Sequence, residues 1–250
     1  MSVIEYPYLT MVLVLAAIFM AAFMACPRTQ RKPMMLSGLL SCPFSLFSFL
    51  FDPEYWHPLR IIDFPFSPED ILFSFTTGGL VWFLSVSLLR TDIILNIHIR
   101  IVLKRYLLTV LHGSIVYAVF WLADIGVMNA ALIGIASVLG HTLWLRRDLW
   151  SISGIGMIGF AVFYAAFTKV TFLAFPVFHQ QWNVGTMWST LLWGVPLGEL
   201  AWAAMFGSTW PLVTAYLFDA RLSGEAGGSA RHTFPRGSGP SGPGGPDRAS

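Results

Sequence analysis

Charged residues are what this sequence has least of. Only 11% of its 250 residues are Asp, Glu, Lys or Arg, whereas 56% are hydrophobic. A soluble globular domain carries about 25% charged residues. The deficit excludes a surface that mainly faces water and indicates that most of the surface faces lipid. The formal net charge of +2 gives no basic footprint, so we expect no nucleic-acid partner.

Motifs for metals, nucleotides and retinal are also missing. The only two cysteines, Cys26 and Cys42, fit no metal-ligand spacing and are interpreted as small apolar residues. No cluster of His, Cys and carboxylates has metal spacing, and no Gly-x-Gly-x-x-Gly segment is present, so neither a metal nor a cofactor is predicted. A retinal protein needs a Schiff-base lysine in its last apolar segment, and Ser189–Phe218 has none.

Long apolar segments dominate what is present. Seven of them have the length of about 17–25 residues that a membrane-spanning helix needs. The sequence therefore predicts an all-α integral membrane protein of seven transmembrane helices. The segments are Tyr8–Ala25, Met35–Phe51, Ile71–Leu89, Tyr106–Ala123, Val127–Leu145, Ser151–Phe175 and Ser189–Phe218.

The basic side chains predict an orientation. Cytoplasmic connections of membrane proteins carry an excess of Lys and Arg. Here every odd-numbered connection and the start of the tail are basic, and the even-numbered connections hold only Arg60. We therefore expect the N-terminus outside and the C-terminus inside, with no cleaved signal peptide. The basic residues are Arg28, Arg31 and Lys32, then Arg90, Arg100, Lys104 and Arg105, then Arg146 and Arg147, and finally Arg221.

Two regions outside the apolar segments have patterns of their own. The third connection, 91–104, alternates apolar and basic residues, which fits an interfacial helix or an early start of the fourth span. The tail, 221–250, is rich in Gly, Ser and Pro and is predicted to be a disordered cytoplasmic segment.

Carboxylates open two of the apolar segments. Glu69 and Asp70 stand at the start of the third segment, and Glu199 stands near the start of the last. Ionisable groups at membrane depth are expensive to bury, so they are functional-site hypotheses by default. The alternative for Glu69 and Asp70 is stabilisation of a helix N-terminus, where negative charge suits the helix dipole.

The two acidic segments also suggest an internal repeat. Aligning Asp70 with Glu199 aligns Gly78 with Gly207, and the upstream residues 55–57 (YWH) resemble 181–183 (QWN). We therefore predict one membrane domain, 1–220, built from two parallel three-helix repeats at about 8–89 and 127–218, with 106–123 as a connecting helix. Such a repeat would place the acids at similar depth, facing one central cavity.

Residues 64–75, which read FPFSPEDILFSF, resemble the Pro-x-Glu-Glu-x-Leu-Phe-Phe element of the lycopene cyclase domain, with Trp56 upstream. This family includes bacterial heterodimeric and fungal fused carotene cyclases. The resemblance covers about 1–220 and implies a repeated helical membrane fold, in a bacterial inner membrane, that cyclises the end group of a linear carotenoid. The sequence departs from the pattern in two places: Pro68 directly precedes the first acid, and Gly198 stands where the second motif would have one.

The resemblance implies that the acidic motif, here Glu69, Asp70 and Glu199, serves proton chemistry. In such a reaction a neutral acid protonates an alkene, a second double bond attacks the carbocation, and a proton is lost. Neighbouring residues on a helix point about 100° apart, so Glu69 and Asp70 do not face each other. We therefore expect a cross-repeat pair, Glu199 with one of these two, to be the proton donor. The other acid or His57 would accept the final proton.

Aromatic side chains near the motifs could stabilise a carbocation through their ring faces. They are Trp56, Phe73, Phe75, Trp182 and Trp202. The alternative for Trp56 and Trp182 is an ordinary anchoring belt at the membrane interface. The expected partners are an apolar polyene or isoprenoid substrate and the lipid bilayer, with a homo- or hetero-oligomer left open. Two other functions stay open: a non-catalytic polyene-binding or isoprenoid-binding protein, and a proton-coupled transporter.

Overall fold

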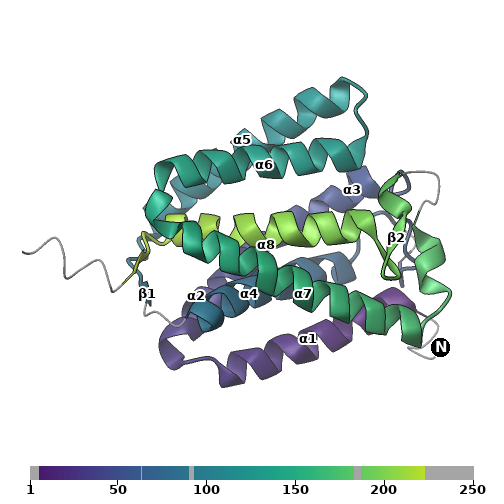
Figure 1. Cartoon of the computed structure of the whole chain (residues 1–250), viewed down its shortest axis with the longest axis horizontal. Coiled ribbons are helices and arrows are strands. Elements are labelled where there is room, and N and C mark those ends of the chain that lie inside the picture. Colours follow the sequence, from purple (N-terminus) through teal and green to yellow (C-terminus); the bar gives the residue numbers. More distant parts are fainter. Residues whose placement is uncertain (1–5, 63, 90–92, 183–186, 223–250) are drawn as a thin grey trace, which may run out of the picture.

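The chain forms a bundle of long helices. The computed structural model describes residues 6–62, 64–89, 93–182 and 187–222, so most of the predicted tail lies outside the described residues. The helices run mainly along one direction of the bundle, with α8 in its centre (Figure 1). They are α1 (Pro7–Ala25), α2 (Arg28–Ser41), α3 (Ser48–Phe51), α4 (Pro68–Leu89), α5 (Ile99–Leu122), α6 (Val127–Leu145), α7 (Trp150–Ala174) and α8 (Leu197–Leu217).

Among the residues that the structure describes, six helical segments are long and apolar enough to cross a membrane, as expected of a multi-pass helical membrane protein. They are Pro7–Ala25, Arg28–Phe51, Pro68–Leu89, Ile99–Leu122, Val127–Leu145 and Arg147–Ala174. The helix α8 is not among them, because tryptophans, hydroxyl side chains and Pro211 lower its hydropathy. Twelve of its 21 residues are buried, which suits its central place. The predicted seven-span topology and its orientation stay predictions.

The helix bounds correct the prediction in three places. The second span starts at Arg28 and loosens after Ser41 into the 3-10 segment η2 (Cys42–Phe47) before α3. The fourth span starts at Ile99 and not at Tyr106, which confirms the early start that the pattern of the third connection left open. The start predicted for the last span, Ser189, is wrong.

The last span starts late because a short hairpin intervenes. Strand β2 (Leu191–Leu192) pairs with β3 (Val195–Pro196), and Trp193 and Gly194 between them have φ of 55° and 79°. A residue with positive φ cannot continue a right-handed helix. The helix α8 therefore begins only at Leu197.

Glycines bring pairs of helices into close contact. The helix α2 packs on α4, where Gly78 faces the Ser41 side chain, and α7 packs on α8, where Gly156 and Gly207 face each other. A Cβ atom at Gly207 would lie 2.7 Å from the carbonyl oxygen of Gly156. In the predicted repeat these two helix pairs are equivalent, and so are Gly78 and Gly207; the repeat itself stays a prediction.

The two ends of the bundle are closed by different short elements. At one end β1 (Ile93–Ile94), which follows α4, pairs antiparallel with β4 (Arg221–Leu222), which follows α8. Residues 221–222, predicted as part of the tail, are therefore ordered. At the other end Trp56 and Trp182 form an antiparallel bridge between the loops after α3 and after α7. These two tryptophans are the central residues of the segments 55–57 and 181–183, which resemble each other in the predicted internal repeat.

Candidate functional site

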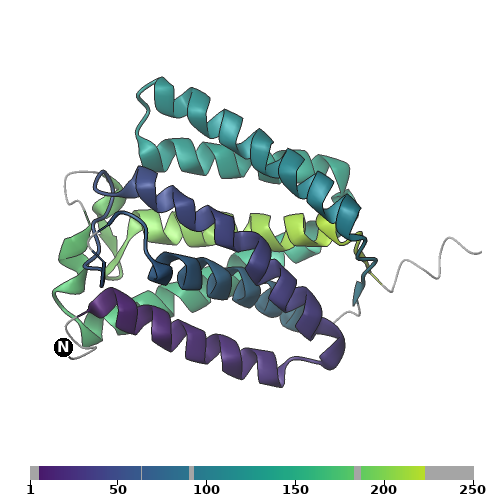
Figure 2. The ribbon, with the colours of Figure 1, turned by 180° about the vertical axis from the view of Figure 1, so that it is seen from behind.

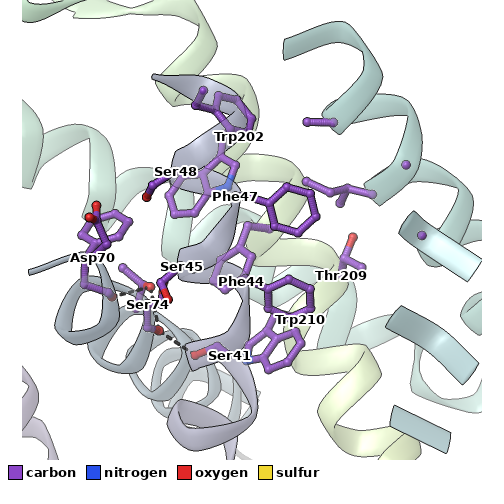
Figure 3. Close-up of a pocket in the computed structure, with 18 of the residues that line it drawn as sticks. Ser41, Phe44, Ser45, Phe47, Ser48, Asp70, Ser74, Trp202, Thr209 and Trp210 are labelled. Carbon is purple, nitrogen blue, oxygen red and sulfur yellow. Dashed lines mark hydrogen bonds between the residues drawn. The ribbon is translucent and has the colours of Figure 1, made fainter. Parts of the chain in front are cut away.

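An apolar cavity of about 270 Å³ lies inside the bundle, and every long helix contributes to its wall. Aromatic side chains from η2 and α8, including Phe44, Phe47, Trp202 and Trp210, surround it (Figure 3). Two carboxyl side chains, Asp70 and Glu199, also line it. The structure thus brings together one acid from each of the two sequence motifs.

Asp70 is buried and held by four donors. It lies in the first turn of α4, where the Ser67 backbone N–H donates to Oδ2 at 2.8 Å and the Ser67 hydroxyl donates to the same oxygen at 3.0 Å. A side chain that reaches back to the backbone N–H before a helix is a capping-box contact. The Tyr8 hydroxyl donates to Oδ1 at 2.8 Å, and Arg60 Nε donates to Oδ2 at 3.2 Å. Asp70 therefore both caps the N-terminus of α4 and forms an ion pair with Arg60.

Arg60 is a site residue that the sequence analysis did not single out. Its side chain is buried and bridges two buried carboxylates, Asp70 and Asp52. Its guanidinium also lies over the ring of Trp56, at 5.9 Å from the centroid, and its Nη2 has no hydrogen-bond partner among the described residues. One signal could have found it: Arg60 is the only Lys or Arg in the even-numbered connections.

Glu199 has a different environment, made of neutral donors. The Tyr164 hydroxyl donates to Oε2 at 2.7 Å. Trp182 Nε1 donates to Oε1 at 3.1 Å, and the Tyr55 hydroxyl donates to it at 3.3 Å. No ion pair among the described residues involves Glu199. Burial, and then the nearby Glu199 carboxyl, raises the pKa of Tyr55, so its hydroxyl remains a donor at ordinary pH.

The small residue at 198 makes room for Tyr55. A Cβ atom at Gly198 would overlap the Tyr55 hydroxyl oxygen and approach Cε of Met128 at 3.0 Å. An acidic side chain at 198, as in the resembling motif, would displace one of the three donors to Glu199. The departure from the motif thus has a structural reason in this chain.

Three of the predicted site residues lie outside the cavity wall. Glu69 accepts a hydrogen bond from the Ile61 backbone N–H at 3.1 Å, so it is directed at the loop before α4. The side chain of His57 is 67% exposed and pairs with Asp52 at 2.6 Å, which places it on the surface of that loop. Phe75 packs on Phe19, with ring centroids 5.0 Å apart.

The other predicted aromatic residues, Trp56, Phe73, Trp182 and Trp202, do line the cavity. Phe73 stacks on Trp202 with centroids 5.9 Å apart, and Trp56 contacts Trp182 at 5.4 Å. Trp182 is only 5% exposed, so it is not a lipid-facing anchor. No group of three or more His, Cys, Asp or Glu among the described residues could hold a metal ion.

No protein-family model, curated protein or solved structure matches this chain. The resemblance of 64–75 to the lycopene cyclase domain therefore rests on the motif alone and stays an expectation.

Proposed function

We propose that this protein is a membrane enzyme that binds the end group of a linear, carotenoid-like polyene in the central cavity and cyclises it by proton transfer. One observation carries the proposal: two carboxyl groups with different surroundings face the same apolar, aromatic cavity. Pairs of carboxyls in contrasting environments are how enzymes separate an acid from a base.

Glu199 is the proton donor in this proposal. Its surroundings supply hydrogen bonds but, among the described residues, no cation, and burying an uncharged carboxyl costs far less than burying an unpaired carboxylate. The proton adds to the terminal double bond, the next suitable double bond attacks the carbocation, and a ring carbon loses a proton. No electrons are gained or lost overall, so no redox partner is required.

Asp70 is the ionised partner. The Arg60 guanidinium beside it stabilises the carboxylate, so Asp70 is a poor donor but can stabilise positive charge in the cavity and accept the final proton. The faces of Trp202 and Phe73 support the same cation. His57 has no part in the proposal because it lies on the loop surface.

The size of the cavity fits an end group. Pockets for drug-sized ligands measure about 300–1,000 Å³. A cavity of about 270 Å³ lies just below this range, so it suits one end of a long polyene and not the whole molecule.

The test is expression in a host that accumulates lycopene, followed by pigment analysis. We expect a cyclised product from the native chain and none from Glu199→Gln. Asp70→Asn is expected to lower product formation by about 10²-fold, as loss of a positioned acid or base does. Asp124→Asn, which changes an exposed carboxyl that does not line the cavity, is the matched control and keeps full activity. Full turnover in both cavity variants would refute the proposed roles.

One observation favours a second function, binding without catalysis. Asp70 is already neutralised by Arg60, which leaves Glu199 as the only cavity-lining carboxyl without an ion pair among the described residues. Unchanged lycopene that co-purifies with the protein would support this binding function. Unchanged lycopene without bound pigment, together with proton-dependent uptake of a solute, would support a transporter.

A further inference from the structure

The end of the cavity next to the acids is closed by two loops. The Trp56–Trp182 bridge joins them, the His57 backbone N–H donates to the Gln181 carbonyl at 2.7 Å, and the Leu59 N–H donates to Gln181 Oε1 at 3.1 Å. The buried Arg60 ion pairs fix one of these loops beneath the surface. A ligand that passes between the described parts of these loops must break this charged and hydrogen-bonded network.

The opposite end is closed by hydrogen bonds between helices. The Tyr106 hydroxyl donates to the Leu40 carbonyl at 2.7 Å, and Trp210 Nε1 donates to the Ser37 hydroxyl at 3.0 Å. Phe44 packs edge-on against Trp210 with centroids 5.3 Å apart. Polar bonds between helices therefore hold this end of the cavity together.

The flank of the cavity between α5 and the α2–η2–α3 segment is closed by fewer contacts. The helix α5 lies at the edge of the bundle and packs mainly on α6 (Figure 2). Among the described residues, the hydrogen bonds and ring contacts between α5 and the α2–η2–α3 segment come from Tyr106 and Tyr117. These tyrosines lie about 16 Å apart along the helix at about 1.5 Å per residue. The α5 side chains between them that line the cavity, including those of Thr109 and Ser114, are small.

The lipid-facing rim of this flank is apolar. On α5 the side chains of Leu107 and Leu111 are exposed, and on the facing segment those of Leu46 and Phe49 are exposed. The facing segment is also the part of the second span that has loosened into η2, because Pro43 lacks a backbone N–H. Both walls of the flank can therefore contact acyl chains.

We propose that this flank, between α5 and η2–α3, is a side opening through which the chain of a bilayer-dissolved polyene enters the cavity. The inference takes the cavity of the proposed function as the ligand site. A cavity of about 270 Å³ holds an end group only, so the rest of a long chain must leave it somewhere. The flank is apolar and weakly closed, so the tail lies there and extends into the bilayer.

The test uses the full chain in phosphatidylcholine vesicles and a conjugated tetraene fatty acid as the probe. Energy transfer from the protein tryptophans to the tetraene reports association in stopped flow. Ser114→Phe fills the flank and should slow association by about tenfold, while Ile115→Phe, its lipid-facing neighbour, should change the rate less than twofold. Phe47→Ala removes the ring contact with Tyr117, at 5.6 Å, and should speed association.

Gln181→Ala weakens the closure between the two loops at the end of the cavity next to the acids, because it removes the hydrogen bond from the Leu59 backbone N–H to the Gln181 side chain. Faster association in this variant, with no effect of Ser114→Phe or Phe47→Ala, would overturn the side opening. If Ser114→Phe does not fold, Thr109→Leu narrows the same flank by less. If the flank variants change the association rate but no cyclised product forms, the proposed function is refuted and the side opening stands. If cyclised product forms but the flank variants do not change the association rate, only the side opening is refuted.

Discussion

Arg60 and the two carboxylates that it bridges are one electrostatic unit. All three side chains are buried, so the cation compensates charge that water cannot reach. Removing one member of a buried ion pair leaves an unpaired charge and costs about 3–5 kcal/mol of stability. The unit therefore fixes both the loop that carries Arg60 and the position of the Asp70 carboxyl group.

Arg60→Met is expected to lower the free energy of unfolding by about 3–5 kcal/mol, measured by denaturant unfolding in detergent. The exposed Arg100→Met is the control and should change stability by less than about 0.5 kcal/mol. Adding Asp52→Asn and Asp70→Asn to Arg60→Met should recover part of the loss, because no unpaired charge then remains. A triple variant as unstable as Arg60→Met would argue against an electrostatic cause.

Gly198 shapes the surroundings of Glu199, because its lack of a side chain leaves space for Tyr55 beside that carboxyl group. Gly198→Ala is expected to lower stability by about 1–3 kcal/mol, as overpacking does, and to reduce product formation. Thermal unfolding and the pigment assay measure the two effects. Gly140→Ala is the control, since nothing lies within 4 Å of a Cβ atom there. Tyr55→Phe should partly restore the stability of Gly198→Ala, because it removes the overlapping hydroxyl; no recovery would mean that the strain lies elsewhere.

The sequence could place both acids that reach the cavity but not their partners. The pattern of carboxylates at apolar boundaries was enough to select Asp70 and Glu199. It could not separate Asp70 from Glu69, because neighbours on a helix point in different directions and only the packed structure shows which one faces inward. The contact between Arg60 and Asp70 depends on how the loop that carries Arg60 lies against the first turn of α4, and no periodicity encodes that.

At the scale of secondary-structure elements, the long helices were easier to predict than the places where an apolar segment stops being helical. Apolar runs fixed the existence of α1, α4, α6 and α7 because lipid-facing helices need them. The η2 break and the hairpin before α8 depend on local proline and positive-φ geometry inside segments that are still apolar. Hydropathy therefore extended the last span across the hairpin.

The contact between α7 and α8 depends on two glycines that let their backbones approach. A Cβ atom at Gly156 would overlap the carbonyl oxygen of Gly207, whereas one at Gly154 would meet nothing within 4 Å. Gly156→Ala is expected to destabilise the protein by about 1–3 kcal/mol. Gly154→Ala, on the same helix, should be neutral or stabilising by up to about 1 kcal/mol. Unfolding midpoints in detergent compare them, and equal midpoints would contradict this account of the helix contact.

At the scale of the whole molecule, α8 determines the topology. Glu199 in its first turn bonds to Trp182 at the end where the two loops meet, while β4 after its last turn pairs with β1 at the other end. The helix therefore runs from one end of the bundle to the other (Figure 1). A helix with 12 buried residues can do this inside a bundle, because its neighbours and not lipid surround its polar groups.

This arrangement predicts seven crossings, although six segments within the described part of the chain are apolar enough by composition. If the basic connections lie in the cytoplasm, the loops at His57 and Asp124 lie outside, so alkaline phosphatase fused after either residue should be active. The same enzyme fused after Asn96 or at the C-terminus should be inactive, and a fluorescent protein fused at the C-terminus should fluoresce in the cytoplasm. Six crossings would leave both chain ends on the same side of the membrane. Phosphatase that is active both after His57 and at the C-terminus would therefore show that α8 does not cross. Inactive phosphatase after His57 and activity after Asn96 would instead invert the orientation, and the acids would then draw their protons from the cytoplasm.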